Sequence, residues 1–131
     1  MILFVCSGNT CRSPLAAALA RVHGVDARSA GLNADPGDPA APEAVRVAKR
    51  YGADLSAHEA RNVQAKLIGE ASQVYAMTNY QAEYLKKRFP DYAERIHMLN
   101  PSISDPYGWG DDAYETCARE LLAAMHNAGI L

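Results

Sequence analysis

The residues most suggestive of chemistry stand in one short loop near the start of the chain, Cys6-Ser7-Gly8-Asn9-Thr10-Cys11-Arg12-Ser13. A phosphate dianion needs several donors that converge on it, and a tight loop supplies them as successive backbone N–H groups. Gly8 and Asn9 tolerate the positive φ that such curling requires. The loop therefore predicts an oxyanion-binding site.

Cys6 and Arg12 have complementary roles in such a loop. Arg12 can hold two phosphate oxygens with its planar guanidinium, and it can hold them better as charge spreads over the equatorial oxygens in the transition state. The same positive surroundings, together with the dipole of a following helix, stabilise an anionic sulfur at Cys6. A thiolate is a competent nucleophile, so we interpret Cys6 as the attacking group.

A carboxylic acid should accompany the nucleophile, because an oxygen leaving group departs poorly unless it is protonated. Asp105 is the candidate, since it lies in the loop after the last expected strand and so at the same edge of a parallel sheet as Cys6. The predicted mechanism is attack by the sulfur on phosphorus, followed by hydrolysis of a phosphocysteine intermediate. No metal or other cofactor is expected, because Arg12 and the backbone amides supply the positive charge.

Strands and helices alternate along the chain, which predicts a parallel sheet with helices on both faces. Ser13 suits the N-cap of the first helix and Pro14 its first position. Residues 33–42 contain three prolines and a glycine and should form a surface loop. In the order βαβααβαβα, the expected elements are residues 2–5, 13–21, 25–29, 42–51, 62–69, 73–77, 79–89, 96–99 and 111–127.

The composition is that of a single globular domain over residues 1–131, with 49% hydrophobic and 21% charged residues. A net charge of -2 gives no general reason to bind nucleic acid or an anionic membrane. The apolar residues 1–5 are too few for a signal sequence or a membrane span. Three cysteines favour free thiols in a reducing compartment, so we expect a cytoplasmic protein.

These motifs resemble those of the low-molecular-weight protein tyrosine phosphatase family over nearly the whole chain. The resemblance rests on the Cys-x5-Arg-Ser-Pro loop, Ser29-Ala30-Gly31, Ala76-Met77-Thr78, and Asp105-Pro106-Tyr107 before a last helix. It implies a four-stranded parallel sheet flanked by helices, and hydrolysis of phosphotyrosine in a protein substrate.

The resemblance also implies roles for individual residues. The hydroxyl of Ser13 would assist the sulfur of Cys6 as a leaving group, although Ser13 could equally be only an N-cap. Asn9 would brace the loop, and Cys11 could form a reversible disulfide with Cys6 that shields it from over-oxidation. Tyr107 would line the mouth of the pocket and stack on a flat substrate group.

Two features favour phosphoarginine as an alternative substrate. Thr10 stands where tyrosine phosphatases of this family commonly have Ile, whereas the bacterial protein-arginine phosphatases resemble this chain in having Thr. The loop at residues 32–42 contains no aromatic side chain and offers Asp35 and Asp38, which would suit a cationic guanidinium. Phosphotyrosine remains the first interpretation.

Two other classes of function are less consistent with the sequence. Arsenate reductases of this fold add two further cysteines past the middle of the chain, and this chain has none between Cys11 and Cys117. A non-catalytic phosphate-binding module would be expected to lack Cys6, Arg12 or Asp105. Cys117 fits the apolar face of the last helix, and the four histidines show no spacing typical of a ligand set.

Overall fold

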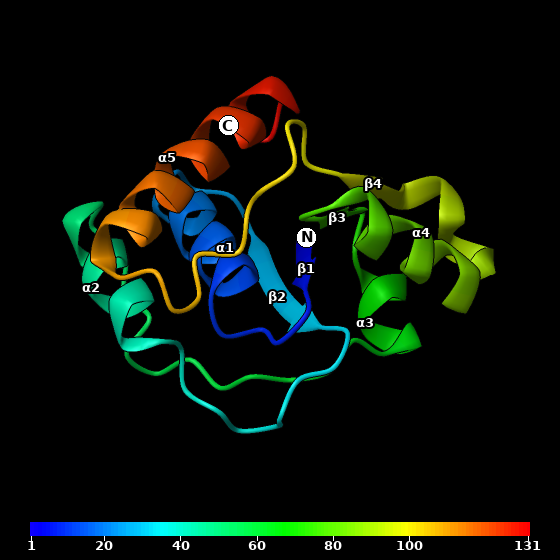
Figure 1. The fold of residues 1–131 in the computed structure, drawn as a ribbon. Helices are drawn as coiled ribbons and strands as arrows, with labels where there is room; N and C mark the ends of the chain where they lie inside the picture. Colours follow the sequence, from blue (N-terminus) through cyan, green and yellow to red (C-terminus); the bar gives the residue numbers. More distant parts are fainter.

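Four short parallel strands form the centre of the fold in the computed structural model, which describes residues 1–131 (Figure 1). They are β1 (Ile2–Cys6), β2 (Ala27–Gly31), β3 (Gln73–Ala76) and β4 (Ile96–Met98), and their spatial order is β2-β1-β3-β4. The chain passes from β1 to one edge and then crosses back to build the other side. A switch in strand order therefore lies beside the carboxyl end of β1, where Cys6 stands.

Helices cover both faces of this sheet (Figure 1). Alternate residues of β1 point to opposite faces, so that Phe4 joins the core beneath one helical layer, while Leu3 and Val5 join the core beneath the other. The first layer consists of α1 (Arg12–Val22), α2 (Pro42–Arg50) and α5 (Asp111–Asn127). The second consists of α3 (Ala65–Glu70) and α4 (Asn79–Arg88), followed by the 3-10 helix η1 (Pro90–Arg95). The predicted fold class is confirmed.

The larger core lies between the sheet and the layer of α1, α2 and α5. Helix α1 is buried along most of its length, because its alanines are small enough to let β1 and α5 approach closely. Tyr114 and Cys117 of α5 are fully or almost fully buried in this core. The prediction that Cys117 belongs to the apolar core is therefore confirmed.

The start of α1 differs from the prediction. Cys11 occupies the N-cap position, and Leu15 donates its backbone N–H to the Cys11 carbonyl at 3.2 Å. Ser13 is thus not an N-cap, and Pro14 is the third helical residue rather than the first. The physical reason is that the Ser13 hydroxyl has buried partners outside the helix, which are described below.

Other boundaries differ for reasons that lie in the turns. Strand β2 begins at Ala27 rather than at residue 25, because Val25 still donates to the Ala20 carbonyl in the turn after α1. Helix α3 begins at Ala65 rather than at residue 62, because Asn62 forms a parallel bridge to Gly31 beside β2. The short helix η1 was not predicted.

Gly31 ends β2 directly against the loop that follows β1. A Cβ atom at Gly31 would lie 2.8 Å from the carbonyl oxygen of Ser7 and 3.1 Å from the Cβ of Asn9. Neither neighbour is the free end of a flexible side chain, so the backbone of the loop would have to move. The loop and the end of β2 can approach each other only because residue 31 has no side chain.

We expect Gly31→Ala to lower the free energy of unfolding by about 1–3 kcal/mol through overpacking. Urea denaturation with a constant m-value would measure the change. Gly8→Ala is the matched control, because a Cβ at Gly8 meets only the Thr10 hydroxyl at 3.8 Å. Equal stability of the two variants would contradict this prediction.

Candidate active site

The sulfur of Cys6 lies at the carboxyl end of β1 and is almost completely buried. The Ser13 hydroxyl, in the first turn of α1, lies 2.9 Å from the Cys6 sulfur. The chain between them therefore turns back on itself and leads directly into α1. This contact is the geometry that the sequence resemblance implies for Ser13, and it explains why the hydroxyl does not cap the helix.

Asn9 holds the centre of this loop. It is fully buried and is the one non-glycine residue with a positive φ, 57°. Its side-chain amide donates to the hydroxyls of Ser13 at 2.9 Å and Ser29 at 3.0 Å, and its side-chain oxygen accepts the backbone N–H of Arg61 at 3.0 Å. Asn9 therefore braces the loop, and of Gly8 and Asn9 only Asn9 adopts the positive φ.

His58 contacts the same residue from outside the loop. Its Nε2 lies 2.7 Å from the Asn9 carbonyl oxygen, which can only accept, so Nε2 carries the proton. Burial lowers the pKa of His58, and the imidazole is therefore neutral at pH 7. The spacing of the four histidines indicated no ligand set, and His58 has a structural role next to the site.

Arg12 connects the loop to the segment that carries Asp105. The buried guanidinium donates from Nη1 to the Ile103 carbonyl at 3.0 Å, and its Nη2 lies 3.9 Å from Oδ2 of Asp105. The Ile103 backbone N–H donates in turn to the Met77 carbonyl, at the end of β3. The predicted nucleophile, cation and acid thus lie at one edge of the sheet, and the Asp105 side chain is 57% exposed there.

A second connection to the loop, through Gln81 of α4, was missed from the sequence. Gln81 is buried, donates from Nε2 to the Ser7 hydroxyl at 3.1 Å and accepts the Met77 N–H on Oε1 at 3.1 Å. Its backbone N–H donates to the Thr78 side chain at the N-cap of α4. A Thr-x-x-Gln pattern at a helix start is the signature of a capping box, and it was the available signal.

A shallow hollow of about 530 Å³ opens beside the loop. Thr10, Asp38, Glu43 and Tyr107 are among the residues that line it, and the Tyr107 side chain is exposed. The Thr10 carbonyl accepts the N–H of Ala41, which holds the 33–42 segment against the loop. Asp38 therefore lies where the sequence analysis expected an acidic rim, whereas Asp35 does not line this hollow.

Cys11 faces α5 within the core. Its sulfur lies 3.1 Å from the Tyr114 hydroxyl, and burial raises the pKa of the Cys11 thiol. All three cysteines are free thiols in this structure. The predicted Cys6–Cys11 disulfide remains a prediction.

The structure contains no cluster of three or more metal-ligating side chains. None of its helices combines the length and apolar character that crossing a membrane requires.

Comparisons with known proteins agree on one family. The family model described as low molecular weight phosphotyrosine protein phosphatase matches residues 1–128. A protein-arginine-phosphatase from Geobacillus stearothermophilus is 36% identical over 130 residues, which cover 92% of this chain and 87% of that protein. The probable low molecular weight protein-tyrosine-phosphatase EpsP from Ralstonia nicotianae is 38% identical over 112 residues, which cover 81% of this chain and 77% of that protein.

The crystal structure of a low molecular weight protein tyrosine phosphatase from T. tengcongensis superposes with a TM-score of 0.90. It is 36% identical in sequence, and the match covers 97% of this chain and 95% of that chain. The YwlE arginine phosphatase from Geobacillus stearothermophilus also superposes with a TM-score of 0.90, at 34% identity, over 97% of this chain and 88% of that chain.

We expect Gln81→Leu to weaken the binding of inorganic phosphate by roughly fivefold, because it removes a hydrogen bond of about 1 kcal/mol that orients Ser7. Calorimetric titration with phosphate, at a temperature well below thermal unfolding, would measure the affinity. Tyr80→Phe, an exposed change on the same helix, is the control. An unchanged affinity in Gln81→Leu would show that the loop keeps its shape without this contact.

Proposed function

Since the chain belongs to the low molecular weight phosphotyrosine protein phosphatase family, we propose that it hydrolyses phosphorylated side chains of proteins with Cys6 as the nucleophile. The observation that carries this proposal is that Arg12, which stands in the same loop as Cys6, lies beside Asp105. The guanidinium belongs to the loop of Cys6 and lies 3.9 Å from the carboxylate of Asp105. A bound phosphoryl group would thus meet a thiol, a cation and an acid at one place.

In the first step the sulfur of Cys6 attacks phosphorus in line with the leaving atom. An S–P bond forms, the bond from phosphorus to the substrate atom breaks, and Asp105 donates a proton to that atom. The backbone N–H groups of residues 7–12 and the guanidinium of Arg12 hold the phosphoryl oxygens, where negative charge develops. The exposed carboxyl of Asp105 reaches a leaving group that projects from the loop.

In the second step water attacks the phosphocysteine. Asp105, now a carboxylate, takes the proton from water as the P–O bond forms, and the S–P bond breaks to return the electron pair to sulfur. The Ser13 hydroxyl, 2.9 Å from the Cys6 sulfur, can donate a hydrogen bond to the departing thiolate. Inorganic phosphate leaves, and neither a metal nor an organic cofactor takes part.

Phosphotyrosine is the first candidate substrate. Tyr107 is 71% exposed in the wall of the hollow beside the loop, where its ring can pack against a phenyl group. The related EpsP protein is described as a probable tyrosine phosphatase.

Phosphoarginine is the second candidate, and a specific observation favours it. Asp38 and Glu43 line the same hollow as Thr10 and Tyr107, so that two carboxylates lie beside the loop of Cys6. The guanidine group that leaves phosphoarginine becomes cationic when it is protonated, and a nearby carboxylate stabilises that positive charge. The phenol that leaves phosphotyrosine is neutral and gains no such stabilisation. The related Geobacillus stearothermophilus protein is described as an arginine phosphatase.

A single domain over residues 1–131 and a cytoplasmic location also remain proposals.

We expect Cys6→Ser to abolish hydrolysis of p-nitrophenyl phosphate, while excess EDTA leaves wild-type activity unchanged. The first result follows because a serine hydroxyl is not ionised near neutral pH, and the second because the charge is supplied by Arg12 and backbone amides. Cys117→Ala is the matched control, since Cys117 is a core thiol outside the loop. Residual turnover in Cys6→Ser, or loss of activity with EDTA, would contradict the mechanism.

We expect Asp38→Asn to lower kcat/KM for a phosphoarginine peptide about two- to fivefold without lowering it for the matched phosphotyrosine peptide. A partly solvated charge contact contributes roughly 0.2–1 kcal/mol. Asp35→Asn is the control, because Asp35 does not line the hollow. A wild-type preference for phosphotyrosine, together with an Asp38→Asn variant that treats both peptides like wild type, would exclude phosphoarginine as the substrate.

A further inference from the structure

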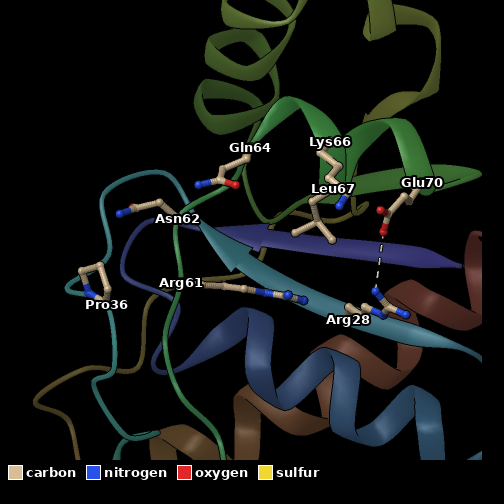
Figure 2. Close-up of a pocket in the computed structure, with 8 residues that line it drawn as sticks. All are labelled: Arg28, Pro36, Arg61, Asn62, Gln64, Lys66, Leu67 and Glu70. Carbon is tan, nitrogen blue, oxygen red and sulfur yellow. Dashed lines mark ion pairs between the residues drawn. The ribbon is translucent and has the colours of Figure 1, made fainter.

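A cationic groove lies along the outer edge of β2 (Figure 2), and none of the proposed catalytic groups lines it. We call it the β2-edge groove, and Arg28, Arg61, Asn62, Gln64, Lys66 and Glu70 are among its lining residues. Its volume is about 520 Å³, and only one of its lining residues is hydrophobic. Three cations and one carboxylate thus line a polar hollow, and none of these side chains takes part in the proposed phosphatase mechanism.

The positive charge of this groove continues around the strand edge. A neighbouring hollow shares Arg28 and Arg61 and adds Arg21, with Glu59 as its carboxylate. In Figure 2, Arg61 extends along β2 toward Arg28. Burial, and then the charge of Arg28, lower the pKa of Arg61. Four cations therefore gather against two carboxylates in a chain whose net charge is -2.

The guanidinium groups differ in how fully they are used. Arg61 donates from Nε to the Ser29 carbonyl at 3.0 Å, and Arg21 donates to the Ala27 carbonyl at 3.0 Å, so both cover acceptors of the edge strand. Arg28 pairs with Glu70 at 3.7 Å, with both side chains about half exposed. Lys66 is exposed and forms no ion pair. The carboxylate of Glu70 is thus already paired with Arg28. Other cationic groups in the groove remain able to bind a second carboxylate.

The β2-edge groove begins close to the loop of Cys6. Cys6 is paired with Gly31, and Gly31 is bridged to Asn62, so these residues stand in register across the sheet edge. Two strand spacings separate Asn62 from Cys6, which is about 10 Å. An extended peptide spans that distance in roughly three residues. A substrate whose phosphorylated residue occupies the loop can therefore place a nearby side chain in the groove.

We propose that the β2-edge groove binds acidic side chains of the phosphoprotein substrate, beginning about three residues from the phosphorylated residue. This inference rests on the proposed function and adds a substrate-docking surface to it. Carboxylates fit because the groove is small, contains separate cations and already holds Glu70. A nucleic acid would need a longer positive face, and Glu59 and Glu70 interrupt this one.

The test compares two phosphopeptides that differ only in having Glu or Gln at the third to sixth positions on either side of the phosphorylated residue. The enzyme variants are wild type, Arg28→Gln/Lys66→Gln, and the control Lys87→Gln/Arg88→Gln, which removes the same charge from the end of α4. Arg61 is left unchanged because it supports β2. Each variant is also assayed with p-nitrophenyl phosphate, which is too small to reach the groove.

We expect wild type to have a KM about three- to tenfold lower for the Glu peptide than for the Gln peptide at low ionic strength. The double change at Arg28 and Lys66 should reduce that ratio toward one, with kcat/KM for p-nitrophenyl phosphate unchanged. Added salt should reduce the ratio in wild type as well, because the contacts are partly exposed.

Equal KM values for the two peptides in wild type would overturn the docking inference. An equal loss of preference in the Lys87→Gln/Arg88→Gln control would also overturn it, because the effect would then come from net charge. Both outcomes leave hydrolysis of p-nitrophenyl phosphate intact and so leave the proposed function standing. Loss of that hydrolysis in wild type would instead contradict the proposed function itself.

Discussion

The backbone of Asn9 lies in the left-handed region, where residues with side chains are disfavoured, and the rest of the site depends on its staying there. The conformation persists because every polar group of the side chain has a partner, on α1, on β2 and on the segment at Arg61. The carbonyl is held by neutral His58. Since the loop can relax only by breaking several buried hydrogen bonds together, its amides are oriented before any ligand arrives.

The loop is also held from its two ends by different parts of the fold. Gln81 fixes Ser7 from the side of β3, and Ser13 meets Cys6 where the chain enters α1. No buried side-chain nitrogen or oxygen lacks a partner in the structure. A site rich in polar groups is thereby placed next to the largest core without an unpaired buried group, which would cost about 1–3 kcal/mol.

The fold could be predicted from the sequence because strands and helices alternate along the chain. Asp105 and Cys6 could be placed at the same edge of the sheet because the carboxyl ends of parallel strands share an edge. Which distant residues hold the loop could not be predicted. Gln81, His58 and Arg61 act through contacts 49 to 74 positions apart in the chain. The preference of a residue type for a helix position was also a poor guide where tertiary hydrogen bonds competed with it. Serine is a good N-cap residue, but the Ser13 hydroxyl is buried against Cys6 and Asn9.

The contact of Arg12 with the Ile103 carbonyl joins residues from nearly opposite ends of the chain. A ribosome releases Cys6 and Arg12 before Ile103, Asp105 and the helix that covers Cys11. Until those later residues have emerged, the Arg12 guanidinium lacks the carbonyl that positions it, and the Cys11 thiol lacks the helix that covers it. The loop can therefore reach the geometry described above only after residues 103–127 have been synthesised and have folded onto it.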